Sequence, residues 1–582
     1  MSPAEQVIVL LLAPGIPLLL ALLLMMPRGQ RVGRMLAPVA AAPALGLVAM
    51  GRVDPPLSVS WLTLGARVGL DRTGLVFLFF TSLIWLLAGL YARRSLASDP
   101  DRVRFLVFFL FAMAGNLGLI IAQDMVLFYV CFALMSFATY GLVVHRGRPQ
   151  DRQAGRIYVA FVVVGEMALF TALLLGHHAA ASLEFAQVRV AVAEHPVRDL
   201  FLAMVVIGFG IKSGAITLHL WMPLAYQASP IPAAGALSGA MFAAGLFGWL
   251  RLLPLGDTAA PEWGSLLVIA GLAAAFFGVI VGLTQYDPKA LLAYSSMSQM
   301  GLMTAGLGAS LAAPQAWPMM LAGLVVFALH HALVKAALFL GLGVARAANT
   351  SQIWPVGIGL LLPSLALAGL PGTSGLLAKA MLKTGAVAAG VWGSWLYAAL
   401  PWSSLATTLL VSRFIWLAWP RPSAQAGGAP RGIWVPWSML LVAVAGASWW
   451  VPGVEVEGLW ARESLLGGFW PIALGALVSA LIAWLNQRGQ WRLSVSLPPG
   501  DLLVLLSSVA ERLVQGASWL GHEWLPGQRQ RVLRLLQTEQ DSAAHTLATS
   551  RMEARITRWP VGIGFYLLLA IALAAMMLAL QE

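Results

Sequence analysis

The sequence predicts an all-α polytopic membrane protein with about sixteen transmembrane helices. Its 582 residues are 59% hydrophobic and only 10% charged, and the mean hydropathy is +0.82. A soluble chain carries roughly 25% charged residues, so these values exclude a water-soluble enzyme. The same low charge excludes intrinsic disorder, and the single Cys131 excludes a disulfide framework.

The predicted spans are the apolar runs long enough to cross a bilayer. A hydrocarbon core ~30 Å thick needs about 20 residues of helix. The first run is flanked by Glu5 instead of basic residues and has no small-residue cleavage site, so we expect a retained span. The runs are 7–26, 32–50, 70–92, 104–122, 124–144, 157–176, 200–218, 231–253, 264–284, 290–312, 317–345, 354–384, 394–419, 433–451, 466–486 and 561–580.

The net charge of +12 is distributed as topology information, not as a nucleic-acid surface. Most of the basic loop residues fall in alternate loops, and the positive-inside rule assigns those loops to the cytoplasm. Both chain termini are then predicted outside, with segment 487–560 in the cytoplasm. The basic loops hold Arg28, Arg31, Arg34, Arg93, Arg94, Arg102, Arg104, Arg146, Arg148, Arg152, Arg156, Lys289, Arg346, Arg421 and Arg431. The opposite loops hold Arg52, Arg67, Arg189, Arg198 and Arg462.

Charge and hydropathy divide the chain into five parts. Residues 1–103 are N-terminal transmembrane helices, 104–420 the core and 421–486 additional transmembrane helices. Residues 487–560 form an amphipathic segment, which leads to a terminal span in 561–582. The amphipathic segment is interpreted either as helices in the headgroup region or as a strut along the bundle. Sixty helical residues would reach ~90 Å, long enough to brace the whole bundle.

Ionisable residues inside the spans are the candidates for function. The chain has five lysines, and three of them, Lys212, Lys335 and Lys379, lie in apolar runs. A buried lysine can release its proton, whereas arginine effectively cannot. A buried charge costs at least ~2.5 kcal/mol, so these groups need an explanation. The others in mid-span are Glu166, the only carboxylate there, with His219, His330 and His331. Any single group is explained equally well by a structural hydrogen bond, but the set indicates a proton relay.

Helix breakers accompany two of the lysines. Pro223, Pro230 and Pro232 follow Lys212, and Pro371-Gly372 precedes Lys379. Unwound backbone at membrane depth is tolerated only where it lines a cavity or is buried in protein. Paired interrupted helices in the two halves of a transporter indicate an ion site between inverted repeats. The two breaks therefore predict an ion path.

At these residues the chain resembles the antiporter-like subunits of respiratory complex I, membrane-bound hydrogenases, formate hydrogenlyase and multi-subunit Na+/H+ antiporters. Asp71, Gly115-Asn116 and Asp124 fit the family pattern upstream, and the resemblance runs from about residue 70 to 420. Four ordered motifs carry it: GFGIKSGAITLHLWMPLAYQASPIPAAGALSGAMFAAGLFGWLRL (208–252), DPKALLAYSSMSQMG (287–301), ALHHALVKAALFLGLG (328–343) and LALAGLPGTSGLLAK (365–379).

The resemblance implies fourteen core helices with two inverted five-helix repeats, in which broken helices carry the lysines. Lys212 and His219 match the family's lysine and histidine of the seventh helix. His331 and Lys335 match the eleventh-helix pattern, with His330 beside them, and Lys379 matches the twelfth-helix lysine. Some members end in a lateral helix and one more span, which favours the strut interpretation of 487–560.

Two departures from the family pattern weaken the first half of the relay. The family has a glutamate in the fifth helix that pairs with the seventh-helix lysine, and here Ala133 occupies its place. The family's eighth-helix lysine is replaced by Ala243 or a neighbour. Glu166, one helix later, is our candidate for the missing carboxylate, because a nearby negative charge would hold Lys212 protonated. The alternative is an inert first half in which Glu166 is a structural acceptor.

We therefore expect a proton- or Na+-translocating subunit of a larger complex in the inner (cytoplasmic) membrane of a prokaryote. The first hypothesis is that this complex is redox-driven, of the NADH-quinone oxidoreductase or hydrogenase type. Two alternatives are a membrane subunit that couples an ion gradient to inorganic-carbon accumulation, and a degenerate scaffold. We expect no cofactor in this chain, since one cysteine cannot ligate an iron–sulfur cluster and no phosphate-binding motif is present. Expected partners are other membrane subunits, a large soluble redox or zinc subunit and lipid, but no nucleic acid.

Overall fold

The computed structural model describes residues 2–51, 53–63, 65–421, 427–451, 462–488 and 497–500. Residues up to 499 form one compact unit, and residues 500–582 form a second. The first unit is almost entirely helical, as predicted. In sequence order the helices up to the second repeat are α1 (Pro3–Met25), η1 (Pro27–Gly29), α2 (Gln30–Leu36), η2 (Ala37–Val39), α3 (Ala42–Met50), α4 (Arg72–Ser95), α5 (Arg102–Ile121), α6 (Met125–Val143), α7 (Pro149–Ala180), α8 (Phe185–Ala193), α9 (Arg198–Ser213), α10 (Trp221–Ala228), α11 (Ile231–Ala236), η3 (Leu237–Met241) and α12 (Ala243–Leu252). They are followed by α13 (Pro261–Leu283), α14 (Pro288–Ala312), η4 (Pro314–Ala316), α15 (Trp317–Ala347), η5 (Thr350–Gln352), α16 (Ile353–Ala368), α17 (Ser374–Val387), α18 (Gly390–Ala418), α19 (Arg431–Gly446) and α20 (Arg462–Gln487).

Each predicted span from 7–26 to 466–486 coincides with a helix or with an interrupted pair of helices. Ten helices of the described residues are long and apolar enough to cross a membrane, or eleven with the bent pair Pro27–Val39 and Ala42–Met50. Among the described residues, the predicted spans at α9 and α19 are too short to be counted, and those at α14 and α18 are long enough but not apolar enough. The predicted span 561–580 and nearly all of segment 487–560 lie outside the described residues.

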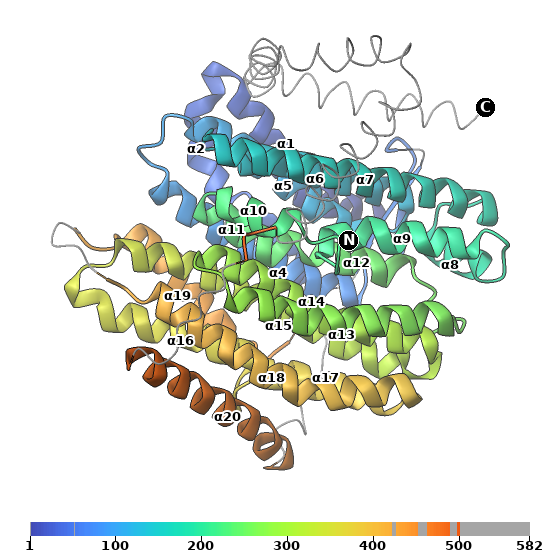
Figure 1. Ribbon diagram of the computed structural model, residues 1–582. Coiled ribbons are helices and arrows are strands. Elements are labelled where there is room, and N and C mark those ends of the chain that lie inside the picture. The colour runs from blue at the N-terminus through green and yellow to red at the C-terminus, as the bar shows by residue number, and fades with distance from the viewer. Residues whose placement is uncertain are drawn as a thin grey trace, which may run out of the picture. The chain divides into compact units, whose positions relative to one another are not determined.

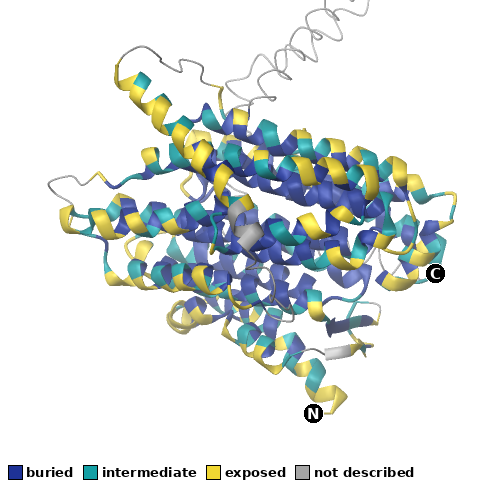
Figure 2. Ribbon diagram, turned by 90° about the horizontal axis from the view of Figure 1, so that it is seen from below, coloured by how far each residue is buried: buried dark blue, intermediate teal, exposed yellow. Residues whose placement is uncertain are grey.

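Burial follows the pattern of a bundle in lipid. Figure 2 shows buried residues through the middle of the helix bundle and exposed residues on its outward faces. Many exposed side chains are large and apolar, such as Leu19, Met167, Ile280 and Val442. An apolar outer surface is stable in a hydrocarbon environment but not in water. The burial pattern therefore agrees with a multi-pass membrane protein.

A β-hairpin closes one end of the bundle and was not predicted. Strand β1 (Val53–Val59) pairs antiparallel with β2 (Ala66–Leu70). The backbone N–H of Arg67 donates to Asp124 Oδ2 (2.8 Å), and the Arg67 side chain forms an ion pair with Glu184. The hairpin thus joins loops 122–124 and 181–184, and we call this end of the bundle the hairpin end.

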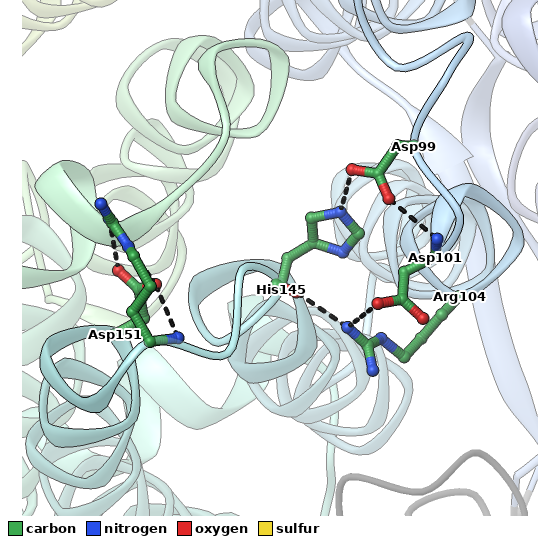
Figure 3. Close-up of polar contacts among 6 residues, drawn as sticks. Asp99, Asp101, Arg104, His145 and Asp151 are labelled. Carbon is green, nitrogen blue, oxygen red and sulfur yellow. Dashed lines mark hydrogen bonds and ion pairs between the residues drawn. The ribbon is translucent and has the colours of Figure 1, made fainter.

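The loops rich in arginine meet at the opposite end, which we call the arginine-rich end. His145, at the end of α6, contacts Asp99 through Nε2 (3.0 Å), and Arg104 of α5 donates to the His145 carbonyl (2.8 Å) (Figure 3). Arg104 also pairs with Asp101 (3.1 Å). Loops that we predicted on one side of the membrane are therefore in contact with one another.

The helix pairing repeats within the chain. Helix α5 packs along α6 as α13 packs along α14, and α7 contacts both halves of α9–α10 as α15 contacts both halves of α16–α17. Figure 1 shows α13, α14 and α15 side by side. Helix α5 begins at the arginine-rich end. Arg251, in the last turn of α12, pairs with Asp71 directly after β2, so α13, the next helix, begins near the hairpin end. The second set of five spans is therefore inverted relative to the first.

Acidification is expected to loosen the arginine-rich end near His145. Burial lowers the pKa of His145, and Asp99 only partly offsets this effect. Burial raises the pKa of Asp99, but hydrogen bonds from His145 and the Asp101 backbone outweigh it, and the net pKa is lowered. Since both folded-state pKa values are lowered, the opened loops bind more protons as pH falls, and stability is lost.

Hydrogen exchange of peptides covering 96–101 and 144–148 tests this at about pH 7.5 and about pH 5.5, on either side of the ordinary histidine pKa. After correction for intrinsic rates, we expect less protection at the lower pH. His145→Gln is the matched control, because an amide keeps a polar contact without titrating. Equal protection at both pH values in the unsubstituted protein would contradict this interpretation.

Candidate ion-translocation site

The first broken helix positions Lys212. Helix α9 ends at Ser213, because Gly214 adopts the left-handed conformation (φ +63°) that glycine tolerates without strain. The chain resumes as α10 at Trp221, whose indole N–H donates to the Ile211 carbonyl (2.8 Å). Lys212 therefore lies in the last turn of α9, 5% exposed, beside unwound backbone.

A close approach of α7 and α9 brings Glu166 and Lys212 together. Gly165 and Gly208 face each other, and a Cβ at Gly208 would lie 3.1 Å from the Gly165 carbonyl oxygen. Small residues permit such backbone contact between membrane helices. Glu166, 5% exposed, follows Gly165 directly, and its carboxylate and the Lys212 amine interact electrostatically without a direct ion pair.

Helix α6 completes the surroundings of this pair. The Glu166 carboxylate lies against Ser136, one turn after Ala133. Tyr158 of α7 donates to the Ser136 carbonyl (2.7 Å), and the Lys212 amine lies 5.9 Å from the centre of the Tyr158 ring. One carboxylate oxygen, Oε2 of Glu166, is buried without a hydrogen-bond partner among the described residues. The carboxylate thus lies beside the helix that lacks the family's glutamate.

The second broken helix positions Lys379. Helix α16 ends before Gly369, which has φ +93°, and α17 begins at Ser374. The Lys379 amine donates to the carbonyl of Ala368 (3.1 Å), which the break leaves available, and to Ser404 of α18 (2.8 Å). Such a carbonyl at a helix C-terminus stabilises a cation. His330 Nδ1 contacts the Ser374 hydroxyl (2.8 Å), which links α15 to the same break.

Lys335 lies in the middle of the bundle. It is fully buried, and its amine donates to the Leu292 carbonyl of α14 (2.9 Å). One turn earlier on α15, His331 packs against Phe242, and neither ring nitrogen has a hydrogen-bond partner among the described residues. Opposite this part of α15, η3 forms a π-helical turn, a distortion frequent at functional sites.

The seven candidate residues fall into two groups, with His219 apart from both. Glu166 lies with Lys212, whereas His330, His331 and Lys335 share α15, and His330 is joined to α17, the helix of Lys379, through Ser374. His219 packs against the rings of Phe277 and Tyr294. Groups of histidine, cysteine and acidic residues able to hold a metal ion are absent from the described part of the chain.

Several polar neighbours of Glu166 and of the lysines were not predicted. They are Ser136, Tyr158, Leu292 through its carbonyl, and Ser404. Ser404 could have been identified from the sequence, because the run 394–419 carries hydroxyl groups at helical spacing. These residues are Ser403, Ser404, Thr407 and Thr408. The other neighbours depend on which helices pack together.

The region that holds both broken helices is similar to a known family. Residues 122–403 match the family model described as NADH:quinone oxidoreductase/Mrp antiporter, transmembrane. Residues 122–403 therefore belong to the antiporter-like subunit family. The matched region includes all seven candidate residues and both broken helices.

Relatives of this antiporter-like region include hydrogenase-4 component B of Escherichia coli (strain K12), which is 30% identical over 308 residues, 51% of this chain and 45% of that protein. The putative antiporter subunit mnhA2 of Staphylococcus haemolyticus (strain JCSC1435) is 28% identical over 345 residues, 55% of this chain and 43% of that protein. The matches thus span less than half the length of these relatives. The fold resembles a chain of the Mrp complex from Dietzia sp. DQ12-45-1b, with a TM-score of 0.72 and 22% identity over 93% of this chain and 63% of that chain.

Ser404→Ala is expected to destabilise the protein, because it removes one of the two hydrogen bonds that the buried Lys379 amine donates. An unsatisfied buried donor costs about 1–3 kcal/mol. The measurement is thermal unfolding of the purified protein in detergent, where we expect a lower midpoint. Ser412→Ala is the control on the same helix, since its hydroxyl bonds only the Thr408 carbonyl of its own helix. Equal midpoints for the two variants would show that the Ser404 contact adds nothing.

Proposed function

We propose that this antiporter-like chain translocates protons as one subunit of a multi-subunit membrane complex. The observation that carries the proposal is the placement of Lys212, Lys335 and Lys379. All three are buried, two lie at helix breaks, and the contacts of Lys335 and Lys379 are neutral oxygens. A lysine held by neutral oxygens can exchange its proton, because no fixed counter-ion holds the charge in place.

In the proposed cycle, Glu166 controls the charge of Lys212. A negative carboxylate stabilises the Lys212 ammonium, and neutralisation of Glu166 releases that proton towards the centre of the bundle. His331 and Lys335 pass protons across the middle. His330 and Ser374 lead to Lys379, which serves the exit. The unpartnered atoms of Glu166 and His331 are positions where water would complete the chain.

We propose that a redox reaction in partner subunits drives the translocation. Support comes from the similarity to hydrogenase-4 component B. A second candidate is ion exchange in an Mrp-type antiporter, with Na+ as the other ion, since a relative is named an antiporter subunit and the fold resembles a chain of an Mrp complex. Purification of the complex with its partners separates the two. Subunits with flavin or iron–sulfur centres favour the first, and Na+-dependent proton exchange without them favours the second.

Substitution of the buried lysines tests the proposed function. We expect Lys212→Ala, Lys335→Ala and Lys379→Ala each to reduce proton translocation by about tenfold or more, because each removes a proton-carrying group. The measurement is proton uptake by membrane vesicles that contain the assembled complex. Lys383→Ala is the control, because Lys383 is exposed on α17 and lies over the Tyr397 ring. Unchanged uptake in all three buried variants would refute the proposal.

Glu166→Gln tests whether this carboxylate replaces the absent fifth-helix glutamate. The amide keeps the shape and a polar contact to Ser136 but carries no charge. We expect normal assembly with strongly reduced proton uptake. A fully active variant would instead support an inert first half with Glu166 as a structural acceptor. A further variant, Glu166→Gln with Ala133→Glu, is expected to regain part of the uptake, because it restores a carboxylate near Lys212.

A further inference from the structure

A fourth lysine, Lys289, is buried at the arginine-rich end. It lies in the first turn of α14 and is 2% exposed. Its amine donates to the carbonyls of Gln227 (2.7 Å) and Ser229 (2.6 Å), at the C-terminal end of α10. Lys289 therefore ties the first broken helix to the second repeat.

The hydrogen bonds of Lys289 are compatible with proton exchange. An ammonium has three N–H bonds, and the two carbonyls accept only two of them. The neutral amine has two N–H bonds and keeps both contacts. Loss of the third proton thus leaves α10 in place. Burial disfavours the charged form of Lys289. The positive charges of Arg146, Arg346 and Arg148 add to this effect, whereas the Asp287 carboxylate opposes it.

Hydroxyl groups lead from the end of α10 towards Lys335. Tyr226 precedes Gln227, and its buried hydroxyl lies beside Ser238 without a hydrogen bond to the described residues. Ser238 contacts Ser296 across the two repeats (3.3 Å). Ser296 donates to the Leu292 carbonyl (3.2 Å), the same oxygen that accepts from Lys335.

We propose that Lys289 is a further proton-carrying residue, which exchanges protons between the arginine-rich end and Lys335 through the hydroxyls of Tyr226, Ser238 and Ser296. Water joins the Lys289 amine to the Tyr226 hydroxyl. Water also joins the Ser296 hydroxyl to the Lys335 amine, because the Leu292 carbonyl that both groups contact accepts hydrogen bonds but does not pass on a proton. Each hydroxyl accepts one proton and releases another, so no bond other than O–H and N–H bonds changes. The inference rests on the proposed function and adds a connection to the arginine-rich end that does not pass through Lys212.

Two conservative substitutions test this connection by proton uptake in vesicles with the assembled complex. Tyr226→Phe removes only the hydroxyl, and we expect uptake to fall about tenfold with normal assembly. Tyr91→Phe is the matched control, because Tyr91 is a buried tyrosine of α4 outside the proposed chain. Lys289→Arg retains donors for the two carbonyls but cannot deprotonate, so we expect assembly without uptake. Lys383→Arg is its control.

The alternative is a purely structural Lys289 that clamps α10. In that case Lys289→Arg keeps the clamp and supports uptake, Lys289→Met disrupts assembly, and Tyr226→Phe is as active as the unsubstituted protein. Active Lys289→Arg and Tyr226→Phe variants, measured beside an inactive Lys335→Ala, would overturn this inference alone. An active Lys335→Ala would instead refute the relay on which the inference depends. If Lys289→Arg fails to assemble, Tyr226→Phe decides the question by itself.

Discussion

Hydrogen bonds from buried amines to backbone carbonyls are the interaction on which this bundle depends. A lysine in the hydrocarbon region is costly unless oxygen atoms surround its amine. Helix ends provide such oxygens, because their last carbonyls have no partner within the helix. Lys379 uses the end of α16, and Lys289 uses the end of α10. At the second break, the interrupted α16 and the buried Lys379 therefore stabilise each other, since the amine needs an oxygen and the Ala368 carbonyl needs a donor.

The proposed relay takes its first carboxylate from a different helix than the family resemblance implies. The place of the family's glutamate on α6 is occupied by Ala133, but Glu166 of α7 lies against Ser136 of that same helix. Two glycines bring α7 and α9 close enough for Glu166 and Lys212 to interact. What matters for the charge on the lysine is the distance to a carboxylate, not the helix that carries it.

Hydropathy predicted the spans well, because every residue that faces lipid has to be apolar over the thickness of the bilayer. The break before Lys379 was predicted where it occurs, at Pro371-Gly372. The break after Lys212 lies at 214–220, before the prolines from which it was predicted, because Gly214 ends α9 and Pro223 is accommodated in the first turn of α10. The hairpin β1–β2 was not predicted, because its short strands carry Pro55 and Pro56 and little alternation. Lys289 was assigned to a loop, since its burial arises only when α10 packs against α14. Partners such as Ser404 come from distant helices, and periodicity within one helix does not identify them.

The π-helical turn η3 allows movement without displacement of a whole helix. A π turn holds one residue more than an α turn, so when the turn moves along the helix by one position, only the residue that it passes rotates, by about 100°. Ser238 lies in this turn and contacts Ser296 of the other repeat. A shift of register by one residue would separate the two hydroxyls while α11 and α12 stay packed in the bundle. The contact between the two repeats can thus be broken by a conformational change confined to the five residues of η3.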